Sequence, residues 1–370
     1  MIFLKALRHL ITLFVVLLAL ATAFAAWSVR IAPDEAGKLC LSWFAFPYLW
    51  IALALVTIIS FAFKSWFIFT IGLAAACATG PSALRVIDIP LSSQGLPEGK
   101  RAIKILTYNI HTFGYANEMD RKHAQDSLMS FLLNSDADVI CLQEMIDLPA
   151  LERQKVVNTD QLKRKYPYID SRRKGGLGQT TLSRLPMTAV TEPAEDVANL
   201  VEQNSAIAND VITGEDTIRI VNCHLASLML NKDLIHAVSG HEEMDSQRID
   251  KLRKTYGQMR AAFHERENEI ATLRSTVEGT NLPVVICGDF NDTPISHTYH
   301  TITSWRGGLA DTRAPRRIGL AKTFRGDLPP LRIDYILTTK DIASADYTEH
   351  DLPTSDHKAL SVSIALKSVK

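Results

Sequence analysis

Three apolar runs fill the first 82 residues of the chain. The runs at about 6–29 and 41–63 are rich in Leu, Val, Ala and Phe, and each is long enough to cross a hydrocarbon core of about 30 Å. The third run, Trp66–Thr79, is shorter and is followed by Gly80-Pro81, so it spans a bilayer only over about 65–82. The first two runs lack the polar face of a helix that packs on a soluble core. The pattern therefore predicts a multi-pass membrane region with three transmembrane helices.

Two other interpretations of this region stay open. Two spans with a re-entrant or interfacial segment also fit the short third run. The Ala23-Phe-Ala25 sequence is typical of a signal-peptide cleavage site, which would remove the first run from the mature protein.

The short loops indicate how the chain is oriented in the membrane. The basic residues that favour the cytoplasmic side are Lys5, Arg8 and Lys64. The Arg30–Lys38 loop is neutral, because its two acidic residues offset its two basic ones. With three spans the chain leaves the bilayer on the outer side, and the Gly- and Pro-containing segment 83–100 is expected to be a linker. Residues 101–370 are then predicted to form one extracytoplasmic globular domain.

The apolar runs beyond residue 100 are short and β-branched. They predict strands at 102–110, 138–142, 180–184, 205–212, 217–223, 283–287, 331–337 and 360–365. Residues 120–133 carry apolar side chains at helical spacing and predict a helix, and residues 234–277 predict one long helix or two, half buried with a charged outer face. Strands and helices together indicate an α/β domain.

Composition excludes few functions. The chain has 40 basic and 40 acidic residues, and residues 1–80 hold five and two of them, so the remainder has 35 and 38, a net charge of −3. No global field therefore attracts the domain to nucleic acid. Basic residues do gather between 153 and 174, where a solvated helix face with a loop is favoured over a ledge for phosphates. Five cysteines without a CxxC pair predict neither a zinc site nor a disulfide framework.

Polar side chains come directly after several predicted strands. Asp289 and Asn291 follow strand 283–287 two positions apart, so an extended chain would place both on one side. An Asx turn accounts for the same residues equally well. Glu144 follows strand 138–142, where an ion pair with an arginine is the structural alternative to a metal ligand. His224 ends another strand, a position where hydrogen-bonded structural histidines are common.

Considered together, the polar residues on or next to apolar strands suggest one shared function. They are Asn109, Glu144, His224, Asp289, Asn291, Asp334, Asp356 and His357. One divalent cation with a phosphate would explain why so many polar groups are placed on buried strands. Oxygen donors with few nitrogens favour Mg²⁺ or Mn²⁺ over zinc.

The sequence around these positions forms six ordered motifs. They are Thr107-Tyr-Asn109, Leu142-Gln-Glu144, Asn222-Cys-His-Leu225, Gly288-Asp-Phe-Asn291, Arg332-Ile-Asp-Tyr335 and Ser355-Asp-His357. In this order they resemble the endonuclease/exonuclease/phosphatase superfamily, which includes deoxyribonucleases, neutral sphingomyelinases and inositol polyphosphate phosphatases. The resemblance covers roughly residues 100–366. It implies a four-layer α/β sandwich, in which two mixed β-sheets are flanked by helices, here preceded by transmembrane helices.

The resemblance also implies a role for each residue. Glu144 would be the principal metal ligand, with Asn109 and Asp356 beside the metal. Asp289 would orient and deprotonate the attacking water. The remaining roles concern the phosphate: Asn291 would hold a non-bridging oxygen, His357 would stabilise developing charge with its ring fixed by Asp334, and His224 would contact the phosphate or protonate the leaving group.

The predicted function is that of an outward-facing, membrane-anchored phosphohydrolase that uses Mg²⁺ or Mn²⁺. Its expected substrates are phosphodiesters at or near the bilayer, lipid headgroups included. A nuclease acting on DNA or RNA is the first alternative, and a non-catalytic membrane receptor or scaffold is the second. The loops expected to select the substrate lie within 145–180 and 226–275 and around 305–330.

Overall fold

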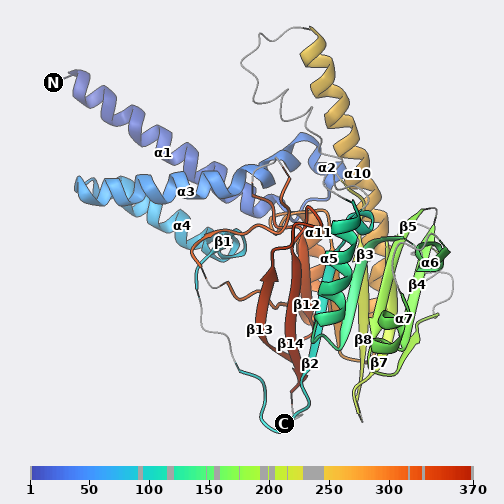
Figure 1. Ribbon diagram of the computed structural model, residues 1–370. Coiled ribbons are helices and arrows are strands. Elements are labelled where there is room, and N and C mark those ends of the chain that lie inside the picture. Colours follow the sequence, from blue (N-terminus) through green and yellow to red (C-terminus); the bar gives the residue numbers. More distant parts are fainter. Residues whose placement is uncertain are drawn as a thin grey trace. The chain divides into compact units, whose positions relative to one another are not determined.

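The computed structural model describes most of the chain as two compact units (Figure 1). The described residues are 2–90, 95–114, 121–146, 148–153, 159–174, 176–191, 199, 205–214, 216–227, 246–315, 317–326 and 330–367. The first unit contains Met1–Ile89 together with Thr293–Thr301 and Arg316–Ala321, and the second contains the rest.

Three long helices dominate the first unit. Its elements are α1 (Ile2–Ser28), α2 (Pro33–Ala36), η1 (Gly37–Cys40), α3 (Leu41–Ala62), α4 (Trp66–Val86) and β1 (Ile87–Asp88). Among the described residues, three segments are long and apolar enough to cross a membrane: His9–Ser28, Pro33–Ala62 and Trp66–Val86. The third segment is longer than predicted: α4 continues through Pro81 to Val86, whereas the predicted span ended at about residue 82.

Small and hydroxylated side chains allow these helices to pack closely. A Cβ atom on Gly72 of α4 would lie 2.1 Å from Oγ1 of Thr57 on α3, so only glycine fits there without displacement. The Thr57 hydroxyl donates to the carbonyl of Leu53 (2.7 Å), and the Trp43 indole donates to Oγ of Ser28 (3.0 Å). These two polar groups within the apolar helices therefore have partners.

The predicted linker 83–100 begins within regular secondary structure. Its first residues complete α4, and β1 pairs antiparallel with β11 (Gly319–Leu320), which belongs to the same unit. Residues 91–94 lie outside the described residues.

Two mixed six-stranded sheets form the second unit. The first sheet has the order β13-β14-β2-β3-β5-β4, and the second has the order β10-β12-β9-β8-β7-β6. Within each sheet the described pairs are antiparallel except one central parallel pair, β2 with β3 and β8 with β9. The first sheet consists of β2 (Ile103–Asn109), β3 (Val139–Ile146), β4 (Tyr168–Lys174), β5 (Leu177–Ser183), β13 (Ile342–His350) and β14 (Ala359–Leu366). The second consists of β6 (Met187–Ala189), β7 (Ala206–Ile212), β8 (Thr217–His224), β9 (Val284–Asp289), β10 (Ala310–Asp311) and β12 (Asp334–Thr338).

The two sheets pack face to face with helices outside them, which confirms the predicted four-layer sandwich. Buried residues of both sheets share one cluster, in which Ile105 and Val139 meet Ile220 and Val285. The helices outside the sheets are α5 (Arg121–Asn134), α6 (Leu148–Arg153), α7 (Thr159–Lys165) and α10 (Ser246–Glu278), and α11 (His297–Ser304) begins in the first unit and ends in the second. Helices α5 and α7 cover the first sheet, and α10 lies against the second, where the Arg219 side chain of β8 donates to the carbonyl of Thr276 (3.2 Å).

Several local predictions were wrong. Residues 168–174 form strand β4, whereas the basic stretch was predicted to be a helix face and loop. Strand β12 begins at Asp334, which was expected in the middle of a strand. No element was predicted for residues 342–350, which form strand β13. Of the predicted helix at 234–277, residues 234–245 lie outside the described residues, and the rest belongs to the single helix α10.

Candidate active site

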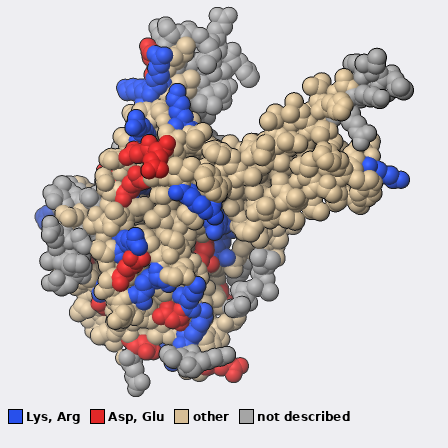
Figure 2. Space-filling model, turned by 180° about the vertical axis from the view of Figure 1, so that it is seen from behind, with Lys and Arg blue, Asp and Glu red and all other residues tan. Residues whose placement is uncertain are grey.

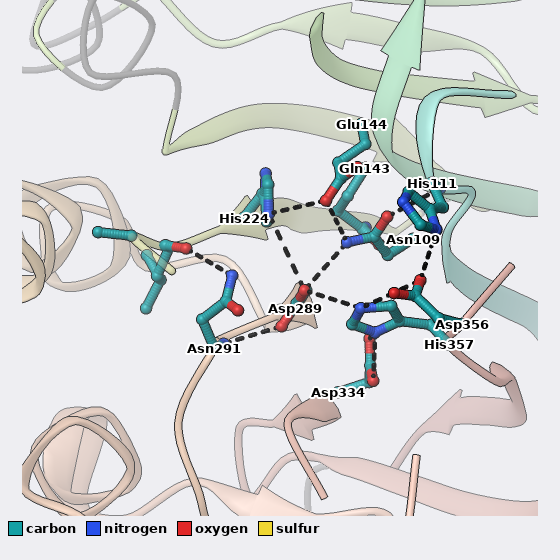
Figure 3. Close-up of polar contacts among 12 residues, drawn as sticks. Asn109, His111, Gln143, Glu144, His224, Asp289, Asn291, Asp334, Asp356 and His357 are labelled. Atoms are coloured by element: carbon teal, nitrogen blue, oxygen red, sulfur yellow. Dashed lines mark hydrogen bonds and ion pairs between the residues drawn. The ribbon is translucent and has the colours of Figure 1, made fainter. Parts of the chain in front are cut away.

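The candidate site lies where the two central parallel pairs end. Asn109 is opposite Gln143 at the ends of β2 and β3, and His224 is opposite Asp289 at the ends of β8 and β9. Carboxyl ends of parallel neighbours meet at one edge of a sheet, so each sheet delivers two strand ends to the same place. Figure 3 shows the side chains from both sheets converging.

Gly288 allows the second sheet to close tightly just before Asp289. Its φ is +134°, and a Cβ atom there would lie 1.9 Å from the carbonyl oxygen of Cys223 on β8. Only glycine combines this backbone conformation with so close an approach. The glycine therefore fixes the position of Asp289 relative to β8.

A bulge turns Glu144 out of its strand. The pairing of β3 with β5 is interrupted between Leu142 and Met145, and Glu144 has a φ of +52°. Bulges of this kind redirect a side chain without ending the strand, and a left-handed non-glycine residue is a strained conformation common at functional sites. The carboxylate consequently reaches the site instead of continuing the alternation of β3.

Asn109 connects the two acidic residues. Its Nδ2 donates to Oε1 of Glu144 (3.1 Å) and to Oδ2 of Asp289 (3.0 Å), and its Oδ1 accepts from the backbone N–H of His111 (3.1 Å). The amide oxygen is thus engaged with the backbone and the nitrogen faces the carboxylates. In this arrangement Asn109 bridges the two carboxylates through its amide nitrogen. Its role as a metal ligand stays a prediction.

Asp289 is held at both carboxylate oxygens. Its Oδ1 accepts from the backbone N–H of Asn291 (2.8 Å), Oδ2 accepts from Asn109, and the residue is 1% exposed. Burial raises the pKa of Asp289, while the neighbouring His357 opposes the shift. Asn291 has a φ of +50°, and one of its side-chain N–H groups donates to the carbonyl of Leu225 (2.8 Å).

His357 faces Asp289 with its ring orientation fixed. Its Nδ1 lies 3.1 and 3.0 Å from the two carboxylate oxygens of Asp334, so Nδ1 carries the proton that they accept. Its Nε2 then lies 3.6 Å from Oδ2 of Asp289. Burial lowers the pKa of His357, but the surrounding carboxylates, Asp334 first and then Asp289, raise it to about 10. Phe324 packs edge-on against the same ring, with 5.1 Å between centroids.

His224 approaches the acidic residues from the opposite side. Its Nε2 lies 3.7 Å from Oε1 of Glu144 and 3.9 Å from Oδ2 of Asp289. Two imidazole Nε2 atoms therefore flank the same oxygen of Asp289, as Figure 3 shows.

Asp356 contacts a residue that was not predicted. His111 Nδ1 lies 2.9 Å from Oδ1 of Asp356, which is itself 3.9 Å from Nε2 of His357. This hydrogen bond raises the pKa of His111 and, against the effect of burial, helps to lower that of Asp356. His111 lies two residues after Asn109, so the alternation applied to Asp289 and Asn291 would have identified it.

Direct contacts thus bring seven of the predicted residues together, and Asn291 joins them through its backbone. The site is rich in carboxylate oxygens, which are the ligands that a hard divalent cation prefers. The carboxylates are those of Glu144, Asp289, Asp334 and Asp356, and their negative charges raise the pKa values of the neighbouring His357 and His111. Asp289, Asp334 and His357 also offer ligand atoms within 4.8 Å of one another, although His357 and Asp334 already bind each other. Glu144, with 23% of its side chain exposed, and Asp356, with 35%, are the more accessible oxygen donors.

Comparison with known proteins identifies the family. A sequence profile of the Endonuclease/Exonuclease/phosphatase family matches residues 106–357, more than half of the chain. The chain belongs to this family, whose members are phosphoester hydrolases that include nucleases and phosphatases and commonly use a divalent metal. The protein is accordingly a phosphoester hydrolase. A search of curated proteins gave no match.

The solved structures that match this chain have low sequence identity. The catalytic domain of human Nocturnin with bound sulfate is 16% identical, covering 72% of this chain and 94% of its own, with a TM-score of 0.46. An endonuclease/exonuclease/phosphatase from Bacteroides vulgatus is 16% identical, covering 72% and 100%, with a TM-score of 0.47. Truncated Caenorhabditis elegans TDP2 is 14% identical, covering 71% and 98%, with a TM-score of 0.46.

Proposed function

We propose that this protein is a membrane-anchored, Mg²⁺-dependent phosphodiesterase in which Asp289 activates the attacking water. The observation that carries this proposal is the setting of Asp289. It is buried, both of its oxygens accept hydrogen bonds, and Nε2 atoms of two histidines flank one of them. A carboxylate held in one orientation with a raised pKa is suited to accept a proton.

The residues divide the proton transfers of hydrolysis between them. Asp289 takes a proton from water as the water oxygen forms its bond to phosphorus, and the bond to the leaving oxygen breaks. His224 supplies the proton that the leaving oxygen needs. His357, oriented by Asp334, donates to a phosphate oxygen on which negative charge develops, and the second N–H of Asn291 can donate to another. Preorganised donors of this kind usually supply much of the rate enhancement.

Glu144 and Asp356, with Asn109 beside them, are the residues that would hold the metal. A bound Mg²⁺ would supply charge neutralisation for the phosphate and lower the pKa of a bound water. Carboxylate oxygens suit Mg²⁺ and Mn²⁺ alike, so both ions belong in the test.

The membrane helices favour a substrate at the bilayer surface. In Figure 2 the long helices of the first unit are almost free of charged atoms, as lipid-facing helices would be. Over the globular part of the same view, basic and acidic residues are interspersed, which gives no continuous basic surface for nucleic acid on that face. We therefore favour phosphodiesters of lipid headgroups outside the cell over DNA or RNA.

A substrate panel tests the proposal. Purified full-length protein in nanodiscs is assayed with Mg²⁺, Mn²⁺ or EDTA on sphingomyelin, plasmid DNA, RNA and bis-p-nitrophenyl phosphate. We expect metal-dependent hydrolysis of the lipid and the small diester, and no hydrolysis by Glu144→Ala. Preference for DNA or RNA would establish the nuclease alternative. Absence of both hydrolysis and calorimetric Mg²⁺ binding would support a non-catalytic receptor.

The outward orientation has its own test. A reporter that is active only in the cytoplasm, fused after residue 370, is expected to be inactive. An active reporter would place the domain inside the cell while leaving the chemistry unaffected.

A further inference from the structure

Helix α10 carries two charged residues on its buried side. The helix has 33 residues (Ser246–Glu278), and the sequence predicted that its charges would form a solvated outer face. Arg266 is 0% exposed and Glu269, three residues later, is 2% exposed. Burying either charge is costly unless strong interactions compensate, so their contacts are informative.

Both side chains hold the backbone of Ala226, just after the strand that carries His224. The carboxylate of Glu269 accepts from the Ala226 N–H (2.8 Å), and Nη1 of Arg266 donates to the Ala226 carbonyl (2.7 Å). Residues three apart lie on one face of a helix, so they can hold the two polar groups of one peptide residue together. The loop after β8 is thereby fixed to α10.

Arg266 also holds the loop after β9. The same Nη1 donates to the carbonyl of Asn291 (3.2 Å), and Nη2 lies 3.4 Å from a carboxylate oxygen of Asp292, which is also buried. Asn291 is one of the left-handed residues of the site, and its side chain donates to Leu225. One guanidinium thus joins the two loops at the point where the Asn291 backbone is strained.

We propose that Arg266 and Glu269 are positioning residues that set the placement of His224 and Asn291 relative to Asp289. The expected effect on the reaction rate rests on the proposed function, whereas the positioning of the two loops does not. A side chain displaced by about 1 Å in such a site can lower the rate about 100-fold. Fixing both loops to one rigid helix prevents that displacement, and this accounts for the burial of two titratable side chains, neither of which contacts a side chain proposed to react.

Matched variants separate positioning from general stability. Glu269→Met removes the acceptor for the Ala226 N–H, whereas Glu269→Gln keeps an acceptor oxygen. Arg266→Met removes the donors, and Arg266→Lys keeps one. Arg274→Met is the control, because Arg274 lies on the same helix, is 60% exposed and pairs only with Glu278 among the described residues.

Hydrogen exchange of the full-length protein in nanodiscs is the first measurement. In Glu269→Met the Ala226 amide is expected to exchange about tenfold faster, as loss of one hydrogen bond predicts. In Arg266→Met the amides of 224–227 and 290–293 should exchange faster while those of β2 and β3 do not change. Unchanged exchange in both segments would overturn the proposal. If Arg266→Met fails to fold, Glu269→Met provides the test at residues 224–227, with Glu269→Gln as its matched control.

Kinetics on bis-p-nitrophenyl phosphate with Mg²⁺ are the second measurement. We expect kcat to fall about 10- to 100-fold in Glu269→Met with little change in KM, near wild-type kcat in Glu269→Gln, and no change in Arg274→Met. Wild-type kcat in folded Glu269→Met and Arg266→Met would refute a positioning role. If the wild type does not hydrolyse the diester, the proposed function fails, and hydrogen exchange alone decides whether the loops are held.

Discussion

Replacing Gly288 by alanine tests the close contact on which the site depends. Gly288 precedes Asp289, and its ideal Cβ would lie 1.9 Å from the Cys223 oxygen, 2.9 Å from the Cys223 carbonyl carbon and 3.0 Å from its nitrogen. All three atoms are backbone, so no side-chain rotation can relieve the overlap.

The size of the effect follows from these distances. Carbon and oxygen in contact normally lie at least about 3.3 Å apart, so β8 and β9 would have to separate by about 1.4 Å. The ladder bond from Leu225 N–H to the Asp289 carbonyl (3.0 Å) is adjacent, and each such bond contributes about 1 kcal/mol. Alanine at a φ of +134° adds about 1–3 kcal/mol of backbone strain. We expect a total loss of about 2–4 kcal/mol, a large part of the stability of a typical domain.

Denaturant unfolding and diester hydrolysis together measure this effect. Because Asp289 moves with the strand, the folded fraction of Gly288→Ala should also lose about 100-fold in rate. Gly257→Ala is the control: a Cβ on Gly257 in α10 meets nothing within 4 Å, and alanine should stabilise the helix by about 0.5–1 kcal/mol. A Gly288→Ala protein with wild-type stability and rate would show that the strands do not approach as described.

Three further predictions concern individual side chains. Asp334→Asn removes the charge that orients His357 and should lower kcat at least about 100-fold with little change in KM, measured on bis-p-nitrophenyl phosphate. Burial raises the pKa of Glu269 to about 8, above its usual 4.5. Between these two pH values the folded protein binds one more proton than the unfolded chain. The free energy of unfolding should therefore fall by up to about 1.4 kcal/mol per pH unit as the pH rises through that range. Urea unfolding of Glu269→Gln should lack that part of the slope. Gly72→Ile should lower the thermal stability of the protein in nanodiscs, because its side chain would overlap Thr57.

Local patterns predicted the α/β class and the strand ends, and the resemblance of the six ordered motifs to a known family implied the four-layer sandwich. Apolar β-branched runs identified β2, β3, β8 and β9, and the polar residues after them are in contact in the structure. Asn109 and Asp289 could be grouped before their distance was known because both are polar residues at the ends of apolar strands.

Tertiary interactions account for what the sequence did not predict. Strand β4 is rich in charged residues, and its pairing along the full length of β5 overrides a composition typical of a loop. The bulge at Glu144 depends on pairing with β5, which no single strand reveals. The burial of Arg266 and Glu269 on α10 could not be predicted from the sequence, because charged residues in a helix usually lie at the surface. Their burial depends on contacts with loops that are distant in the sequence.

The rate of bis-p-nitrophenyl phosphate hydrolysis across a Mg²⁺ titration, for wild type and Asp289→Asn, tests the central claim most directly. The asparagine keeps the shape of the side chain and removes its ability to accept the proton of water. We predict a wild-type rate that rises with Mg²⁺ and a variant rate about 10²- to 10⁴-fold lower at every concentration. A folded variant with a rate within about threefold of wild type would contradict the role of Asp289 as the proton acceptor.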